Sequence, residues 1–327
     1  MYADALAATG REVDERIAAL DLALHNAQTE RDIAQREAAD ASAEVTRLDS
    51  ALGAEQVARK AADARAATAE ATRLTAEARV RELEQLLAGV PAGWKLAFED
   101  TFDGAAVDLT KWNVRSDTQS NHLGKNQPAN ARQSGGLLGL WCERLATAIS
   151  GKPYSTAYLD TNGKPGAVRY GRWEIRCTLP KAKGAWPAFW LRDAALLGEI
   201  DVMEAVLNGK GGGKIVFTVH QSTNGDQAKK GFTFTPPAGF DWAALHDFAV
   251  EWDGTTMTWF VDGKTAATTN VTQLPWLATS FGPAGMNIRL NYQAGGSMPN
   301  YYGLPMDATS VLPDVFTVDR VRVLTKA

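Results

Sequence analysis

The sequence predicts a protein in two parts, a long α-helical coiled coil followed by an antiparallel β-sandwich. All ten Trp, all 13 Pro and both Cys lie beyond residue 90, and Tyr2 is the only aromatic residue before that point. Residues 1–90 are rich in Ala, Glu, Arg and Asp, whereas residues 91–327 have the aromatic, Gly and Pro content of a folded β-rich domain. The second part is long enough to enclose one sizeable core.

A single heptad register runs through residues 1–90 without a skip. Its apolar members include Ile17 and Leu24 at a positions and Leu6, Val13, Leu20, Leu48, Leu83 and Val90 at d positions. Apolar residues at a and d form the seam of a coiled coil. Charged residues interrupt the seam at Arg31, Glu55, Arg59 and Arg73. Such residues weaken a seam locally but can fix its register and its number of strands.

A helix of this kind needs partner helices to bury its apolar stripe, and the simplest partners are copies of itself. We therefore expect a homo-oligomer through residues 1–90, with a parallel trimer favoured over a dimer. Two alternatives stay open: a single helix stabilised by Glu and Arg pairs, and a hairpin folded back at Gly53. The helix is expected to end where Pro91 and Gly93 break it.

Beyond residue 93 the chain consists of short β runs separated by Gly, Pro, Asn and Asp. The runs are LLGLWCERL, YGRWEIRCTL, AWPAFWLR, GEIDVMEAV, KIVFTVHQ, GFTFT, DFAVEWD, TMTWFVDG, MNIRLNYQ and VDRVRVL. Apolar and polar residues alternate in several runs and no helical pattern intervenes, which indicates an antiparallel sandwich. Cys142 and Cys177 fall in two runs that could pair, so a disulfide and two free thiols are both open.

The run GEIDVMEAV carries three carboxylates, Glu199, Asp201 and Glu204. In a regular strand Glu199 and Asp201 share a face, whereas Glu204 points to the other one. One extra residue, in a β-bulge at Val202 and Met203, would return Glu204 to the face of its partners, and bulges re-aim side chains beside active sites. We predict a bulged strand with three acids on one face.

Three neighbouring carboxylates suit cleavage of a glycosidic bond, in which one attacks the sugar carbon and another protonates the leaving oxygen. Retaining enzymes hold these two groups about 5–5.5 Å apart, and inverting enzymes about 6.5–9.5 Å apart. Asp201 could share a proton or a hydrogen bond with Glu199 and keep it ionised, while crowded negative charge raises the pKa of Glu204. The alternative is an edge strand whose acids face water.

Six blocks surround the acids in the order GRWEIRCTLPKAKGAWPAFWLRD, GEIDVMEAV, FTVHQ, DFAVEWDGTTMTWFVDGK, NIRLNYQAGG and VFTVDRVRVL. From about Gly93 to Leu324 this order resembles glycoside hydrolase family 16, which contains laminarinases, lichenases, agarases and carrageenases. The resemblance implies an all-β jelly-roll sandwich (concanavalin-like), with an open cleft across its concave sheet. It also implies an endo-acting, retaining glycoside hydrolase of β-1,3-linked or mixed-linkage glucan. In that reading Glu199 is the nucleophile, Asp201 its modulator and Glu204 the acid/base.

Aromatic side chains near the acids are candidates for sugar binding, because an indole packs on the apolar face of a pyranose ring. Alternation puts Trp186 and Trp190 on one side of their strand, just upstream of the acids. The resemblance implies further substrate contacts at Asn121, Tyr158, His220, Asn291 and Gln293. Tyr158 stands where many family members carry Arg or Glu, which leaves the exact specificity open. Four other tryptophans are assigned to the core: Trp94, Trp112, Trp252 and Trp259.

The sequence contains no cluster of Cys and His with metal-ligand spacing and no Gly-rich phosphate loop, so we expect no cofactor for hydrolysis. The resemblance implies one possible structural Ca²⁺, held by Asp319 and by carbonyls near Thr101 and Gly135. Coordination by oxygen alone suits calcium. A solvated Asp at the start of a strand is the alternative.

The opening MYADALAATGREVDERI has no apolar signal core, and no segment is long enough to cross a membrane. A formal charge of −4 gives no attraction to nucleic acid. Yet the polysaccharides that such a fold cleaves lie outside cells. The layout resembles a bacteriophage tail fibre or spike, which is made in the cytoplasm and displays a glycan-degrading domain on a trimeric stalk. We therefore expect a virion protein with other virion proteins as possible partners.

Three alternatives to this expectation stay open. A dedicated export machine would also carry the protein outside the cell, with the helix as a tether. The domain could be a glycan-binding receptor without turnover, although the complete set of acids argues against that. It could also be a structural cap on a spacer. Release of reducing ends from a glycan separates a hydrolase from the last two.

Overall fold

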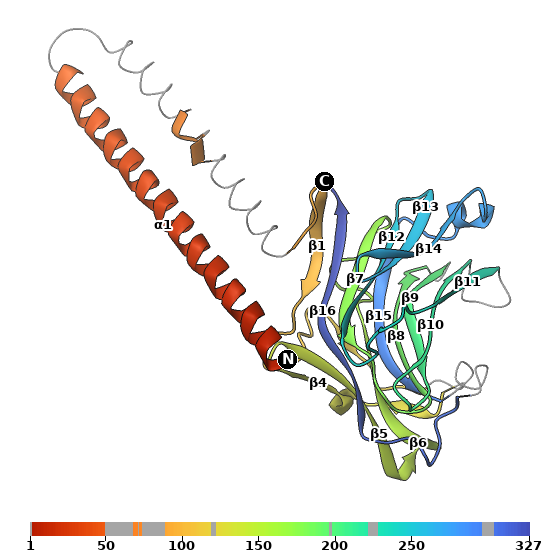
Figure 1. Cartoon of the computed structure of the whole chain (residues 1–327). Helices are drawn as coiled ribbons and strands as arrows, with labels where there is room; N and C mark the ends of the chain where they lie inside the picture. Colours follow the sequence, from red (N-terminus) through yellow and green to blue (C-terminus); the bar gives the residue numbers. More distant parts are fainter. Residues whose placement is uncertain are drawn as a thin grey trace. The chain divides into compact units, whose positions relative to one another are not determined.

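The computed structural model describes residues 2–49, 68–70, 72–73, 89–118, 122–195, 198–221, 228–295 and 304–327. The chain divides into two compact units, Met1–Gly89 and Val90–Ala327 (Figure 1). Within the described residues, no helix combines the length and the apolar character that a membrane span requires.

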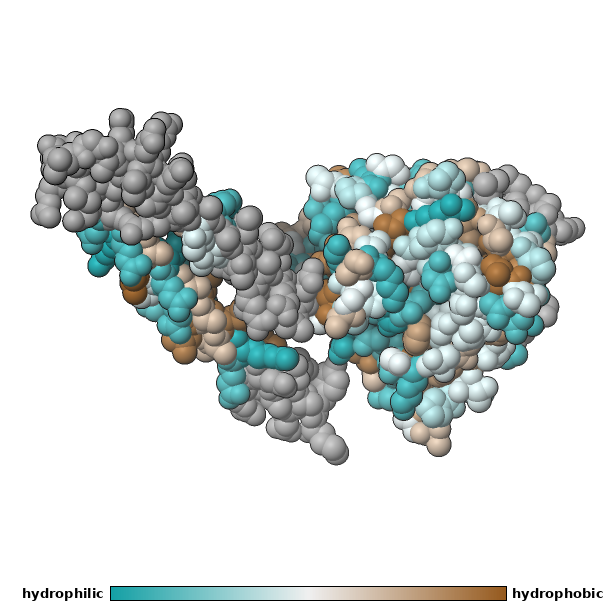
Figure 2. Space-filling model, turned by 90° about the horizontal axis from the view of Figure 1, so that it is seen from above, coloured by the Kyte–Doolittle hydropathy of each residue, from teal (hydrophilic) through white to brown (hydrophobic). Residues whose placement is uncertain are grey.

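The first unit contains one long helix, α1 (Tyr2–Asp49). Its seam residues Val13, Ile17 and Leu24 are 48%, 46% and 49% exposed, and Leu22 and Ile33, which lie off the seam, are also exposed. Figure 2 shows hydrophobic residues among hydrophilic ones along the described part of this helix. Among the described residues, α1 is the one long helix and its apolar seam is about half exposed, so the coiled coil stays a prediction.

Several residues that bear on the stalk lie outside the described part of the chain. They include Gly53, where a fold-back was considered, and the seam residues Glu55 and Arg59. Arg73 is described, and it forms an ion pair with Glu70 at 2.6 Å. That pair is of the kind that stabilises a single helix.

The second unit consists of strands joined by short loops and two 3-10 helices. The elements are β1 (Trp94–Asp100), β2 (Asn113–Val114), β3 (Gly124–Asn126), η1 (Pro128–Asn130), β4 (Ala131–Ser134), β5 (Leu137–Ile149), β6 (Lys152–Asp160), β7 (Gly171–Thr178), β8 (Ala185–Asp193), β9 (Glu199–Leu207), β10 (Gly213–His220), β11 (Lys229–Phe234), β12 (Leu245–Trp252), β13 (Thr256–Val261), β14 (Lys264–Asn270), η2 (Pro275–Thr279), β15 (Met286–Ala294) and β16 (Asp314–Lys326).

These strands form two layers around one core (Figure 1). The first layer has the order β11-β10-β9-β8-β15-β6, and the second has the order β5-β16-β7-β12-β13-β14; the pair β5 and β6 joins them. Both layers contribute fully buried aromatic side chains to the core: Phe189, Phe217 and Tyr292 from the first, and Trp173, Phe248 and Trp259 from the second. The predicted antiparallel sandwich is confirmed.

The two cysteines lie on strands that do not touch. Cys142 of β5 pairs with Asp314 of β16, and Cys177 of β7 pairs with Val318 of β16, so β16 lies between them. Two strand spacings amount to about 10 Å, which exceeds the Cα separation of about 7 Å that a disulfide tolerates. Both cysteines are buried and free. The disulfide alternative was wrong because strand order, not the runs themselves, decides which strands pair.

Candidate active site

Strand β9 contains one more residue than its neighbours between Asp201 and Glu204. Opposite it on β10, these two residues face Thr218 and Val216, so three steps along β9 match two along β10. The register with β8 shifts at the same place. The predicted β-bulge is therefore present.

The bulge turns two consecutive side chains into the core, Val202 and Met203. A regular strand would send them to opposite faces. Trp259 reaches this point from β13, and its Nε1 donates a hydrogen bond of 2.9 Å to the carbonyl of Asp201. Buried carbonyls need such partners, so a side chain from the opposite layer satisfies the backbone at the bulge.

Because of the bulge, Glu199, Asp201 and Glu204 share the face of the first layer that points away from the core, which we call the outer face. Asp201 is 3% exposed and Glu204 is 7% exposed. Nε1 of Trp186 donates a hydrogen bond of 2.9 Å to Oε1 of Glu204. The predicted strand with three acids on one face is confirmed.

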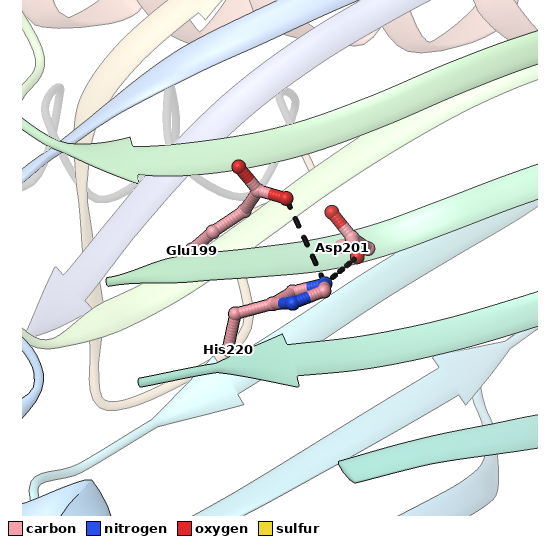
Figure 3. Close-up of side chains that lie close together, drawn as sticks. All are labelled: Glu199, Asp201 and His220. Carbon is pink, nitrogen blue, oxygen red and sulfur yellow. Dashed lines mark hydrogen bonds and ion pairs between the residues drawn. The ribbon is translucent and has the colours of Figure 1, made fainter. Parts of the chain in front are cut away.

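His220 faces two of the acids, Glu199 and Asp201, from the neighbouring strand β10 (Figure 3). Its Nε2 is 3.1 Å from Oδ2 of Asp201 and 3.7 Å from Oε1 of Glu199. The sequence predicts that Asp201 shares a proton or a hydrogen bond with Glu199, whereas in the structure Asp201 forms hydrogen bonds with His220 and Thr218. Strand pairing explains this, because His220 on β10 lies directly opposite Glu199 on β9.

Burial raises the pKa of all three acids. It raises the pKa of Glu199 to about 7, with the charge of Asp201 adding to the effect. It also raises the pKa of Asp201 to about 7. The pKa of Glu204 lies well above its usual value, first because of burial and then because of the charge of Asp201. The predicted direction for Glu204 is confirmed, whereas Asp201 opposes rather than favours ionisation of Glu199.

Four further predicted contacts occupy the same outer face, on strands β8, β15 and β6: Trp190, Asn291, Gln293 and Tyr158. Nε1 of Trp190 donates a hydrogen bond of 2.7 Å to Oδ1 of Asn291. Gln293 is 4% exposed and lies opposite Trp186 in the register of β15 and β8. Tyr158 on β6 pairs with Asn291. The strand order thus brings these predicted residues together with the acids.

One predicted contact, Asn121, lies outside the described residues. Its neighbour His122 is 5% exposed, and its ring packs at 5.0 Å against Trp186. Burial and the charge of Lys152 lower the pKa of His122 to about 4. No periodic pattern identifies His122, because it stands in a loop before β3.

Two arginines on the outer face were not predicted as site residues. Arg192 lies directly opposite Glu199 in the pairing of β8 with β9. Arg289 of β15 donates a hydrogen bond of 2.9 Å from Nη1 to the hydroxyl of Tyr158. Alternation could have found both, because Arg192 shares its face with Trp190, and Arg289 shares its face with Asn291.

Ligand atoms of Glu199, Asp201 and His220 all lie within 4.8 Å of one another, close enough to hold a metal ion. The residues predicted for calcium fit less well. Oδ2 of Asp319 lies 3.6 Å from Nε of Arg176, so this carboxylate already faces a cation. Gly135 has a positive φ of 60°, and Thr101 uses its hydroxyl to bond Asp103. Structural calcium stays a prediction and takes no part in the mechanism below.

A hollow with an empty volume of about 600 Å³, its open mouth included, lies on the second layer, away from the acids. Its lining includes Trp94, Tyr170, Glu251, Trp252 and Lys326. None of the predicted substrate-binding residues lines it. The open cleft expected over the outer face stays a prediction.

Comparison with known proteins finds relatives of this domain. Glucan endo-1,3-beta-glucosidase A1 of Niallia circulans is 28% identical over 75% of this chain, and Beta-glucanase of Rhodothermus marinus is 33% identical over 52% of it. The chain spans 40% and 63% of the length of these two relatives. The laminarinase catalytic domain of Thermotoga maritima superposes with a TM-score of 0.63 at 26% identity, over 72% of this chain and 99% of that one.

The match to a family model is broader than any single motif. The model described as Glycosyl hydrolases family 16 matches residues 119–309, which include all three acids and the strands that carry them. This stretch is more than half of the chain. The protein is therefore a member of glycosyl hydrolases family 16.

Proposed function

We propose that the chain is an endo-acting, retaining glycoside hydrolase that cleaves β-1,3-linked or mixed-linkage glucan or a related cell-surface polysaccharide. The observation that carries this proposal is the bulge in β9, which gathers Glu199, Asp201 and Glu204 on one face, with Asp201 and Glu204 buried. The names of the relatives from Niallia circulans and Thermotoga maritima support β-1,3-glucan as the leading substrate.

In the proposed reaction Glu199 attacks the anomeric carbon while Glu204 protonates the glycosidic oxygen. Glu204 then removes a proton from water, and that water cleaves the bond between the sugar and Glu199. Burial and the charge of Asp201 raise the pKa of Glu204 well above its usual value, which favours the protonated form that an acid needs. Since Trp186 donates to Oε1 of Glu204, the proton to be transferred is held by Oε2. This route uses only carboxyl groups and water, so it needs no cofactor.

Asp201 and His220 act in this scheme as positioning residues. Their hydrogen bond of 3.1 Å fixes His220 beside Glu199. The charges of His220 and of the nearby arginines favour the ionised nucleophile. Trp186 and Trp190 supply apolar ring faces for sugars on the same surface.

The test is release of reducing ends from laminarin by the full chain. Glu199→Gln and Glu204→Gln should each lower kcat by at least about a thousandfold, because each removes a group that takes part in bond cleavage. Glu143→Gln, at a partly exposed acid of β5, is the matched control. NMR of the first product should show the β-anomer. An α-anomer first would refute retention, and binding without release would favour a receptor.

We also propose that residues 1–90 form a parallel homotrimeric stalk that displays the hydrolase on a phage virion. The exposed apolar seam of α1, at Val13, Ile17 and Leu24, supports an oligomer. Immunogold electron microscopy with an antibody to the second unit would test the location. Label absent from every virion structure would count against this part of the proposal.

A further inference from the structure

Arg192 and Arg289 form a pair of cations on the outer face beside the proposed nucleophile. Arg192 stands on β8 directly opposite Glu199, and Arg289 stands on the neighbouring strand β15, directly opposite Trp190. Both guanidinium groups lie near the ring of Trp190, with Cζ at 6.0 Å for Arg192 and 5.3 Å for Arg289. The two side chains therefore flank one indole.

Both arginines have a buried donor that bonds nothing in the described part of the chain. Nε of Arg192 and Nε of Arg289 are buried, and no described residue accepts a hydrogen bond from either. Arg289, which is 7% exposed, donates one bond, to the hydroxyl of Tyr158. Among the described residues, neither guanidinium has a carboxylate oxygen within the 4.0 Å of an ion pair.

The nearest acids are engaged elsewhere. Asp160 pairs with Arg289 in the strand register, yet its carboxylate accepts from Asn113 at 2.8 Å and from Arg115 at 3.3 Å. Arg115 also binds Asp117. These contacts leave Glu199 as the acid that faces the arginine pair, and the pKa of Glu199 is raised to about 7.

Two partly buried cations without an ionic partner are unfavourable. Burial lowers the pKa of Arg192, and the charge of Arg289 lowers it further, while Glu199 opposes both. An oxyanion would reverse these costs, because the planar fork of an arginine matches a carboxylate or sulfate with two parallel hydrogen bonds. A neutral sugar hydroxyl could accept a hydrogen bond from an arginine N–H, but it would not neutralise the charge of the guanidinium group.

We propose that Arg192 and Arg289 form a subsite for an oxyanion substituent, a sulfate ester or a carboxylate, on the glycan that the enzyme cleaves. The inference rests on the proposed hydrolase function and narrows its substrate class to acidic glycans. Trp190 provides the ring face beside which the charged sugar lies. Tyr158 holds Arg289 in place by accepting the hydrogen bond from its Nη1.

The experiment compares neutral laminarin, partially sulfated laminarin and laminarin oxidised to carboxylates at C6, all cleaved by the full chain. The ratio of kcat/KM on an acidic glucan to kcat/KM on the neutral one should fall about tenfold in Arg192→Met and in Arg289→Met, since each loses a charged hydrogen bond. Arg132→Met, at an arginine that pairs with Glu143 on β4 and β5, should keep the ratio. Comparison of sulfated with carboxylated laminarin shows which of the two anions the subsite prefers.

Arg289→Lys separates loss of the subsite from a folding defect. It keeps the positive charge but loses the planar guanidinium that forms two parallel hydrogen bonds. This variant should retain folding by circular dichroism and still show a reduced ratio. The preference of the unmodified chain for acidic glucan should also weaken between 0.05 M and 0.5 M NaCl, as screening increases. An equal fall on neutral and acidic glucans would overturn the subsite and leave the hydrolase intact.

Calorimetric binding of the same glucans separates failure of the subsite from failure of the hydrolase. If no glucan is cleaved, the hydrolase proposal fails, yet the subsite still requires tighter binding of acidic than of neutral oligosaccharides. That difference should disappear in Arg192→Met and Arg289→Met. Equal affinities in the unmodified chain would reject the subsite.

Discussion

Glu204 is buried and Glu199 is half-buried, and different side chains touch the two carboxyl groups. Glu204 accepts the N–H of Trp186 at 2.9 Å, and its pKa lies well above the usual value. Glu199 lies 3.7 Å from His220, and nearby positive charge limits the rise of its pKa to about 7. Two carboxyl groups with separated pKa values are what an acid and a nucleophile require.

The pH dependence of kcat/KM follows from these shifts. Glu199 attacks only when ionised, so activity should rise with pH through a midpoint near its pKa of about 7. Glu204 acts only when protonated, so activity should fall again at higher pH, where that group ionises. Initial rates on laminarin across pH 4 to 10 would check this. Because Asp201 titrates in the same range, the midpoint belongs to the cluster; a midpoint below about 5 would contradict it.

The same shifts predict that the site lowers stability at alkaline pH. A carboxyl group whose pKa is raised on folding costs nothing below its unfolded value of 4.5. The cost grows between that pH and the folded value of about 7, and it stays constant above. Glu199→Gln removes this cost, so it should raise Tm by about 5 °C at pH 8 and by much less at pH 4. Calorimetry at the two pH values measures the difference, with Glu143→Gln as the control. An equal rise at both would show that ionisation is not the cause.

At the scale of the element, strand β9 presents its three acids on one face only because it contains one extra residue. The extra residue lies between Asp201 and Glu204 and leaves Val202 and Met203 together in the core. The motif required this, because a spacing of three residues otherwise sends the two acids to opposite faces. The bulge could therefore be derived from the sequence, whereas the hydrogen bond from Trp259 that supports it could not.

Trp259 provides a test of that support. Trp259→Phe keeps a buried ring and removes the N–H that bonds the carbonyl of Asp201 at 2.9 Å. We expect kcat to fall about tenfold with KM nearly unchanged, since an unpaired buried carbonyl costs roughly 1–3 kcal/mol and loosens the acids. Trp173→Phe is a matched control, because Trp173 is fully buried and its Nε1 has no partner. If both variants lowered Tm equally and neither lowered kcat, Trp259 would contribute to packing alone.

At the scale of the whole molecule, the two units differ in how they bury their apolar side chains. The second unit buries its own core between two layers, but α1 leaves Ile17 and Leu24 about half exposed, at 46% and 49%. Burying those side chains requires another helix. An oligomer is thus a property expected of the full chain and not of the sandwich.

Sedimentation of the full chain tests this expectation. We predict a trimer that dissociates when Ile17→Glu and Leu24→Glu are combined, because each helix then places two charges in the apolar seam. Leu22→Glu is the control, since Leu22 is 62% exposed and lies off the seam. A monomer for the unmodified chain would refute the stalk, and loss of the trimer in Leu22→Glu would place the contact on another face.

Spacing and composition alone fixed the division near residue 90, the strand-rich second unit and the three acids on one face, because alternation and heptad periodicity are local properties of a chain. Strand order settled the rest. It set His220 beside Asp201, made neighbours of Arg192 and Arg289, and put β16 between the two cysteines. These partners are far apart in sequence, and only the packing of the layers determines which of them meet.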